Sequence, residues 1–113
     1  MKNIGCVIYT ETKNGIKAEY VFCKNNAISR GTGIGIRLIE SKLKKRFEGA
    51  YEIIYTDING IKSPKLKLII SLELGCYKLS WSNNEETIGI GIGIEKDNKL
   101  SVGWIEIEEG VLL

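Results

Sequence analysis

The sequence predicts a mostly β protein: a single small antiparallel β-barrel of about eight strands, or a strongly curved sandwich, with one short helix. Short segments rich in β-branched and aromatic residues recur at even spacing, and turn residues separate them. Residues 89–94 read Gly-Ile-Gly-Ile-Gly-Ile, and residues 31–36 carry a similar row. In a strand, such a row places isoleucine on one face and no side chain on the other, which permits tight curvature. The 113 residues fit one domain, 1–113, with a sizeable core.

Three strands are expected in the N-terminal part, at residues 4–12, 16–23 and 28–36. The first two flank Asn14-Gly15, and Asn-Gly between two such segments is a strong signal for a β-hairpin. These residues therefore predict a hairpin followed by a third strand.

Residues 37–47 break the strand pattern. Their apolar residues are spaced by one, four and four positions: Leu38, Ile39, Leu43 and Phe47. Because the positions between them are charged residues and serine, this spacing predicts a short amphipathic helix, with Gly49 as a candidate for its C-terminal cap.

Five further strands are expected after the helix, at residues 51–58, 65–73, 77–81, 87–95 and 99–108. The first of them ends at Asp57-Ile58-Asn59-Gly60, which we interpret as a turn because it lacks the further ligands of a calcium loop. Pro64 stands just before the second, where a missing amide hydrogen is tolerated.

The glycine row at residues 89–94 constrains the register of its neighbours. A two-residue turn at Asp97-Asn98 would place Val102 opposite Gly93 and Trp104 opposite Gly91. Large side chains would then fill the bare face of the row.

The preceding strand depends on the length of its loop. A loop at residues 82–86 would bring Tyr77, Leu79 and Trp81 onto the glycine face, with Leu79 opposite Gly89. A two-residue loop at Asn83-Asn84 would instead place Trp81 with the isoleucines.

Five aromatic residues are candidates for lining a cavity that holds a hydrophobic or aromatic ligand: Tyr51, Tyr55, Tyr77, Trp81 and Trp104. Core packing would explain the same residues, because an eight-stranded barrel is only just wide enough for its own side chains. The sequence leaves both interpretations open.

The isoleucine side of the row predicts an apolar outer patch: Ile88, Ile90, Ile92, Ile94, Ile105 and Ile107. Such a patch is too apolar to face water alone. Either the predicted helix covers it, or it is the interface of a homo-oligomer.

Composition bounds the partners. A net charge of +2 is too small to indicate nucleic acid, which is not expected as a partner. The only basic cluster (Lys42, Lys44, Lys45 and Arg46) fits a solvated helix face. The sequence contains no long apolar run, so no contact with a membrane is expected. No signal-peptide pattern is present, so a cytoplasmic location is expected, although a mature secreted protein without its signal would look the same.

The residue types also limit the chemistry. With no histidine, the chain cannot use histidine for acid–base catalysis, nucleophile activation or metal binding. Cys6, Cys23 and Cys76 lack metal-ligand or disulfide spacing and are expected to be small buried hydrophobes. The carboxylate clusters Glu85-Glu86 and Glu106 to Glu109 fit solvated surface. We therefore expect no metal and no cofactor.

Four segments share a strand pattern with known proteins: residues 49–55 (GAYEIIY), 77–81 (YKLSW), 91–94 (GIGI) and 100–104 (LSVGW). Together they resemble uncharacterised small bacterial β-barrel domains of lipocalin-like or avidin-like kind. The resemblance covers residues 49–105 and implies a calycin-like barrel. Its motifs are strand-packing motifs, so it assigns no ligand-contacting residue.

The two glycine rows raise the question of an internal repeat. Aligning Asn25-Asn26 with Asn83-Asn84 superimposes the rows and places Cys23 on Trp81. A duplicated strand pair and convergence on the same strand chemistry both remain open.

The favoured function is a non-enzymatic binding module for a small hydrophobic ligand or a protein partner. A structural homo-oligomer with a solid barrel core is the alternative. A cofactor-free isomerase or cyclase using a buried tyrosine or glutamate is a third.

Overall fold

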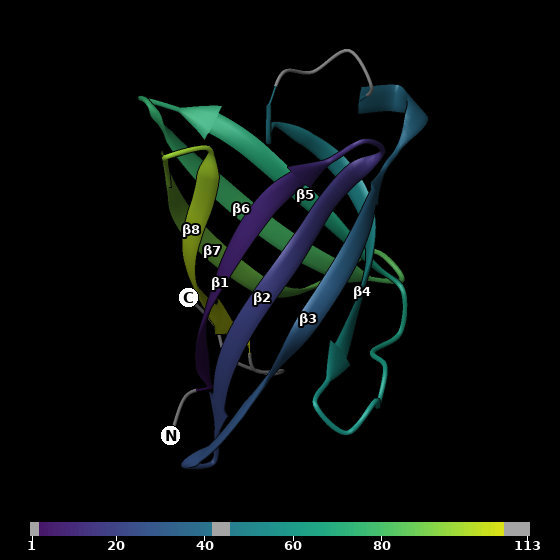
Figure 1. Cartoon of the computed structure of the whole chain (residues 1–113), viewed down its shortest axis with the longest axis vertical. Helices are drawn as coiled ribbons and strands as arrows, with labels where there is room; N and C mark the ends of the chain where they lie inside the picture. The colour runs from purple at the N-terminus through teal and green to yellow at the C-terminus, as the bar shows by residue number, and fades with distance from the viewer. Residues whose placement is uncertain (1–2, 42–45, 108–113) are drawn as a thin grey trace.

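The computed structural model describes residues 3–41 and 46–107, which form one closed antiparallel β-barrel (Figure 1). Each strand pairs with the next along the chain, and β8 closes the barrel against β1. The strands are β1 (Ile4–Thr12), β2 (Gly15–Lys24), β3 (Ala27–Arg37), β4 (Gly49–Asp57), β5 (Leu66–Glu73), β6 (Cys76–Asn83), β7 (Glu86–Lys96) and β8 (Lys99–Glu106). The predicted barrel is confirmed, and closure leaves no unpaired sheet edge.

Two-residue turns with left-handed backbone conformations join four of the hairpins: Asn25-Asn26, Leu74-Gly75, Asn84-Glu85 and Asp97-Asn98. Such turns match the right-handed twist of the strands they connect. The predicted turn at Asp97-Asn98 is confirmed, and with it the pairing of Val102 with Gly93.

The β6–β7 hairpin differs from both loops considered for it. Its turn is Asn84-Glu85, and a register shift follows, so that Ser82 pairs with Thr87 but Trp81 pairs with Gly89. The prediction that Leu79 lies opposite Gly89 is therefore wrong by two residues. The inward direction of Trp81 was right, because a bulge in β7 absorbs the extra residue.

That bulge corrects one residue of the predicted isoleucine patch. Ile88 is the residue skipped in the pairing, and its side chain packs against the barrel core instead of facing outward. Simple alternation along the row fails at this one position.

A helix beginning at Arg37 was also predicted, and this is wrong. The amide of Arg37 donates to the carbonyl of Asn14, and the amide of Leu38 donates to the carbonyl of Ala50, so the chain is still extended there. A short 3₁₀ helix, η1 (Ile39–Ser41), follows. The rest of the expected helix, residues 42–45, lies outside the described residues.

The two ends of the barrel differ. β4 begins at the end drawn at the top of Figure 1, and Phe47, two residues before that strand, is fully buried. It packs edge-to-face on Tyr77, and its carbonyl accepts a hydrogen bond from the hydroxyl of Tyr51. We call this the closed end, and the opposite end, near the N-terminus, the open end.

The cysteines are not buried as expected. Cys6 and Cys76 are exposed and Cys23 is half-buried. Alternation explains the position of Cys6, because its neighbours Gly5 and Val7 both point into the barrel.

Candidate functional site

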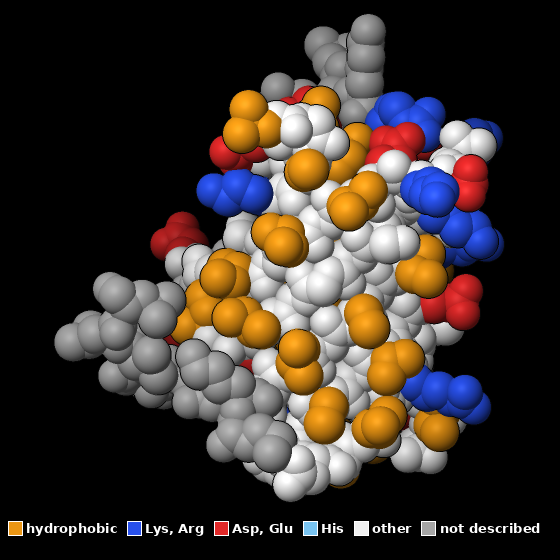
Figure 2. Space-filling view, turned by 90° about the vertical axis from the view of Figure 1, so that its left-hand side faces the viewer, with side chains coloured by type: hydrophobic (Ala, Val, Ile, Leu, Met, Phe, Trp, Pro, Cys, Tyr) orange, Lys and Arg blue, Asp and Glu red, His pale blue; other side chains and the backbone are white. Residues whose placement is uncertain are grey.

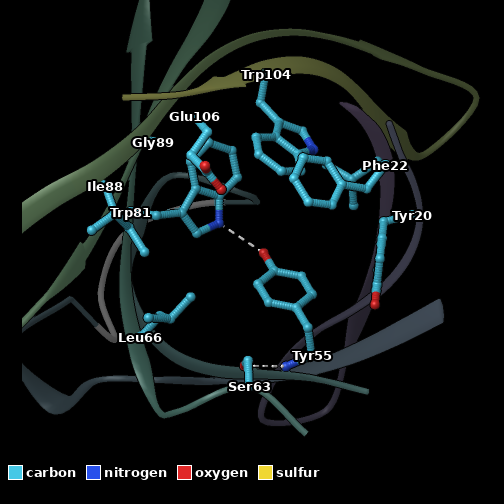
Figure 3. A pocket seen from close by; sticks show the side chains of 11 residues that line it. Tyr20, Phe22, Tyr55, Ser63, Leu66, Trp81, Ile88, Gly89, Trp104 and Glu106 are labelled. Atoms are coloured by element: carbon cyan, nitrogen blue, oxygen red, sulfur yellow. Dashed lines mark hydrogen bonds between the residues drawn. The ribbon is translucent and has the colours of Figure 1, made fainter. Parts of the chain in front are cut away.

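A cavity of about 250 Å³ occupies the open end of the barrel (Figure 3). Its walls are mostly apolar and aromatic: Val7, Tyr20, Phe22, Tyr55, Ser63, Leu66, Trp81, Ile88, Gly89, Trp104 and Glu106. Tyr20, Phe22 and Trp104 are half-exposed, so the cavity meets solvent on their side. An apolar enclosure with few polar groups is the usual form of a small-molecule site.

The glycine rows make room for this cavity. Four of its aromatic residues each lie directly opposite a glycine in the strand register: Tyr20 with Gly31, Tyr55 with Gly33, Trp81 with Gly89 and Trp104 with Gly91. Because glycine has no side chain, a large ring can lie across the neighbouring strand.

The register also relates the two halves of the chain. Tyr20 and Tyr55 flank the row of β3 as Trp81 and Trp104 flank the row of β7. The counterpart of Trp81 is therefore Tyr20 and not Cys23, which pairs with Ile28. The turn at Asn84-Glu85, one residue later than the asparagine pair, and the bulge in β7 together shift the expected correspondence.

A chain of hydrogen bonds forms the floor of the cavity. The indole Nε1 of Trp81 donates to the hydroxyl of Tyr55 at 2.7 Å, and the hydroxyls of Tyr55 and Tyr9 share a hydrogen bond of 2.6 Å. Burial raises the pKa of Tyr55 to about 12, and burial raises the pKa of Tyr9 well above its usual value. Both phenols are therefore neutral near pH 7, and the bonds fix the orientation of both rings.

Trp104, on β8, forms another part of the cavity wall. Its ring stacks on Phe22 with 4.8 Å between centroids, and it lies 5.9 Å from the ring of Trp81. It also lies flat against Gly5, where an added Cβ would be 2.6 Å from Cε2 of the indole. A glycine at position 5 is thus required for this orientation of Trp104.

Glu106 is the only charged side chain among the described residues that line the cavity. Its Oε1 accepts a hydrogen bond of 2.9 Å from Nδ2 of Asn3, and its amide donates to the carbonyl of Asn3. Asn3 is 8% exposed and is the only polar residue in the buried part of the described chain. Asn3 therefore fixes the carboxylate at the rim of an otherwise apolar space.

The five predicted cavity residues divide into two groups. Tyr55, Trp81 and Trp104 line the cavity, whereas Tyr51 and Tyr77 point inward at the closed end. There the hydroxyl of Tyr51 donates to the carbonyl of Phe47 at 2.7 Å, and the hydroxyl of Tyr77 donates to Oε1 of Glu95 at 2.8 Å. Both hydroxyls are used by the protein itself.

The predicted outer patch is largely on the surface. Ile92 and Ile94 are 72% and 65% exposed, and Ile90 and Ile105 are also exposed. Ile107 lies beyond β8 and is half-buried. None of the described residues forms a helix over this side of the barrel, so the expectation that a helix covers it is not met.

Strand β1 extends the patch. The register aligns Ile4 with Ile105 and Ile90, and it aligns Ile8 with Ser101 and Ile94. We call the set Ile4, Ile8, Ile90, Ile92, Ile94 and Ile105 the isoleucine face. Figure 2 looks onto the side of the barrel where β8 lies in Figure 1, and hydrophobic side chains are spread across it.

Residues 3–41 and 46–107 contain no cluster of three or more cysteine, aspartate or glutamate side chains able to hold a metal ion. No helix among them is long and apolar enough to cross a membrane.

Comparison with known proteins found no counterpart. No protein-family model matches the chain, and no curated protein or solved structure matches it either.

Proposed function

We propose that this protein is a small non-enzymatic binding module that holds a hydrophobic ligand in the open end of its barrel. The observation that carries the proposal is the cavity of about 250 Å³ between Trp81, Trp104 and Tyr55. A cavity of about 150 Å³ is enough for benzene. A substituted aromatic ring or a short branched aliphatic group is therefore the expected size of ligand. The resemblance to lipocalin-like and avidin-like domains is consistent with a ligand inside the barrel.

Binding fits the walls better than catalysis does. The hydroxyl of Tyr55 already accepts a hydrogen bond from Trp81 and shares another with Tyr9. Because its pKa is raised to about 12, it stays protonated near neutral pH and cannot act as a general base. A cofactor-free isomerase or cyclase would depend on Glu106 alone, which makes that third interpretation the weakest.

Titration with tert-butylbenzene, a neutral apolar probe, tests the proposal through tryptophan fluorescence. Both tryptophans line the cavity, so saturable binding is expected to shift their emission. Gly89→Val places a branched side chain in the cavity, where an added Cβ meets its nearest atoms at 3.4 and 3.5 Å, and should abolish the shift.

The matched control is Gly103→Val on the outer surface, where an added Cβ meets no atom within 4 Å. It should bind the probe as the unmodified protein does. Failure of the unmodified protein to bind, or equal binding by the Gly89→Val variant, would overturn the proposal.

A second candidate function rests on the isoleucine face, which we propose to be the interface with a second copy of this chain. Ile92 and Ile94 protrude, whereas the residues opposite them on β8 are Gly103 and Ser101. One face thus offers both ridges and a groove, as an interface between identical surfaces requires. A surface groove runs beside them, lined in part by Ile4, Ile90 and Ile92.

Light scattering across a range of protein concentrations measures the molar mass and so tests this assembly. The unmodified protein is expected to reach the mass of a dimer, and Ile92→Lys is expected to lower the measured mass toward that of the monomer. Cys6 pairs in register with Gly103 and should react more slowly with a thiol reagent as the protein associates. Cys76, exposed at the closed end, is the internal control. A monomer at every concentration would refute the assembly.

A further inference from the structure

The cavity has a single charged group, and its position indicates more than apolar binding. Figure 3 shows Glu106 beside the indole of Trp81, among the side chains that line the cavity. Its Oε1 accepts a hydrogen bond from the side chain of Asn3. Its Oε2 accepts no hydrogen bond from any of the described residues. One carboxylate oxygen is held, and the other is left for a ligand.

The surrounding rings add to the same electrostatic preference. The face of an aromatic ring carries negative potential, and tryptophan is the best ring for attracting a cation. The ring centroids of Trp81 and Trp104 lie 5.9 Å apart, the ring planes are inclined at 50°, and both residues line the same cavity. Tyr20, Phe22 and Tyr55 complete the aromatic lining, and no lysine or arginine is present in it.

A second acidic residue lies near the same end. Asp57 pairs with Gly31 as Glu106 pairs with Gly89. Burial raises the pKa of Tyr20, and the negative charge of Asp57 raises it further. The carboxylate of Asp57 accepts hydrogen bonds from the backbone amides of Asn59 and Ile61, so it stabilises a turn. Its contribution to ligand binding is limited to the negative electrostatic potential at the open end of the barrel. Glu106 remains the group that a ligand can reach.

We propose that the open end of the barrel recognises a monovalent organic cation: an amine or quaternary ammonium group on a small apolar body, with its charge against Glu106 and the two indoles. This inference rests on the proposed binding function and names the class of its ligand. Asn3 is a positioning residue, because it holds Glu106 without reaching the ligand space. A buried cation without a counter-charge is unfavourable, and here the carboxylate supplies one.

Two probes of the same shape separate charge from hydrophobicity. Phenyltrimethylammonium carries the charge, and tert-butylbenzene is its neutral isostere. Affinity for each is measured by fluorescence titration in the unmodified protein and in Glu106→Gln, which keeps an oxygen for Asn3. The expected result is a loss of about tenfold or more in affinity for the cation, with affinity for the neutral probe unchanged.

Glu86→Gln is the matched control, because Glu86 begins β7 at the same end of the barrel, is exposed and lies outside the cavity. It makes the same change in net charge and should leave both affinities unchanged. Salt provides a second measurement that needs no variant. Added salt should weaken binding of the cation to the unmodified protein and leave the neutral probe unaffected.

The outcomes distinguish the two proposals. If tert-butylbenzene binds but the cation does not, or if Glu106→Gln changes both affinities equally, cation recognition is refuted while apolar binding stands. If tert-butylbenzene itself fails to bind, the binding function is refuted.

Discussion

The two ends of the barrel are built from the same eight strands and are filled in opposite ways. At the closed end, Phe47 lies inside the barrel and packs edge-to-face on Tyr77, with 6.3 Å between the ring centroids. At the open end, Phe22 stacks on Trp104 at the rim and is half-exposed. Each end has a phenylalanine paired with a larger ring, but only the first pair fills the interior. A segment of chain folded inward makes one end solid, and the other end keeps a cavity.

Arg37 holds the closed end together. Its guanidinium donates to the carbonyls of Arg46 and Glu48 and to the hydroxyl of Tyr51, and it lies 4.8 Å from the centre of the Tyr51 ring. The Tyr51 hydroxyl in turn donates to the carbonyl of Phe47. The backbone of residues 46–48 is thereby tied to β3 and β4. Charged hydrogen bonds of this kind are stronger than neutral ones.

The largest effect we expect is unfolding at high pH. Burial raises the pKa of Tyr51 and Tyr55 to about 12, and the pKa values of the other three tyrosines are raised as well. Because the unfolded chain loses these protons near pH 10, their contribution to stability is complete below pH 10 and is lost as pH rises toward 12. For Tyr55 alone the loss is about 2 to 3 kcal/mol.

Circular dichroism and tyrosinate absorbance, recorded together as pH is raised, check this prediction. Both signals should change in one transition above pH 10, since ionised Tyr51 can no longer donate to Phe47. Formation of tyrosinate near pH 10 in a barrel that stays folded would show that these hydroxyls are not buried as described.

The next effect compares the two phenylalanines. Phe47→Ala removes a fully buried ring from the closed end and should lower the free energy of unfolding by about 3 to 5 kcal/mol. Phe22→Ala removes a half-exposed ring from the rim and should cost only about 1 kcal/mol. Urea denaturation measures both. Equal costs would mean that the two ends are packed alike.

The smallest effect compares two glycines of one strand. At Gly93 an added Cβ would meet Val102 at 2.9 Å and both Leu100 and the carbonyl of Ser101 at 3.0 Å, so Gly93→Ala should destabilise the barrel by about 1 to 3 kcal/mol. At Gly89 the nearest atoms are 3.4 Å away or farther. Gly89→Ala should therefore be neutral or add up to about 0.5 kcal/mol, since alanine is less costly to order in a strand.

Thermal or urea denaturation of the two alanine variants, under identical conditions, gives the difference directly. If Gly89→Ala were as destabilising as Gly93→Ala, the open end would have no spare volume beside Trp81.

The sequence was sufficient for the features that depend on local pattern. The turn at Asp97-Asn98 set the β7–β8 register correctly and placed Trp104 inside. The face of Trp81 depended on the length of the β6–β7 loop, and the sequence left it open. The alternation of residues along a strand predicts which face of the sheet a side chain lies on. It does not predict how far along the barrel axis that side chain lies. Tyr51 and Tyr77 were therefore grouped with residues at the opposite end.

Features that depend on distant pairing were missed. Gly5 meets Trp104, and Asn3 meets Glu106, only because β8 closes against β1, which joins residues about a hundred positions apart. The one local signal was Gly5 itself, an inward glycine in a strand, which implies a large neighbour on that face. The bulge at Ile88 left no local signal, because the row of alternating glycine and isoleucine continues through it.

Diffraction from crystals of the protein under xenon pressure tests the central claim most directly, because xenon enters apolar cavities without needing a specific ligand. We predict a xenon atom in the open end, in the cavity lined by Tyr55, Trp81 and Trp104, and none between Tyr51 and Tyr77 at the closed end. An open end without xenon, or xenon bound equally at both ends, would contradict the division of this barrel into a solid half and a ligand-binding half.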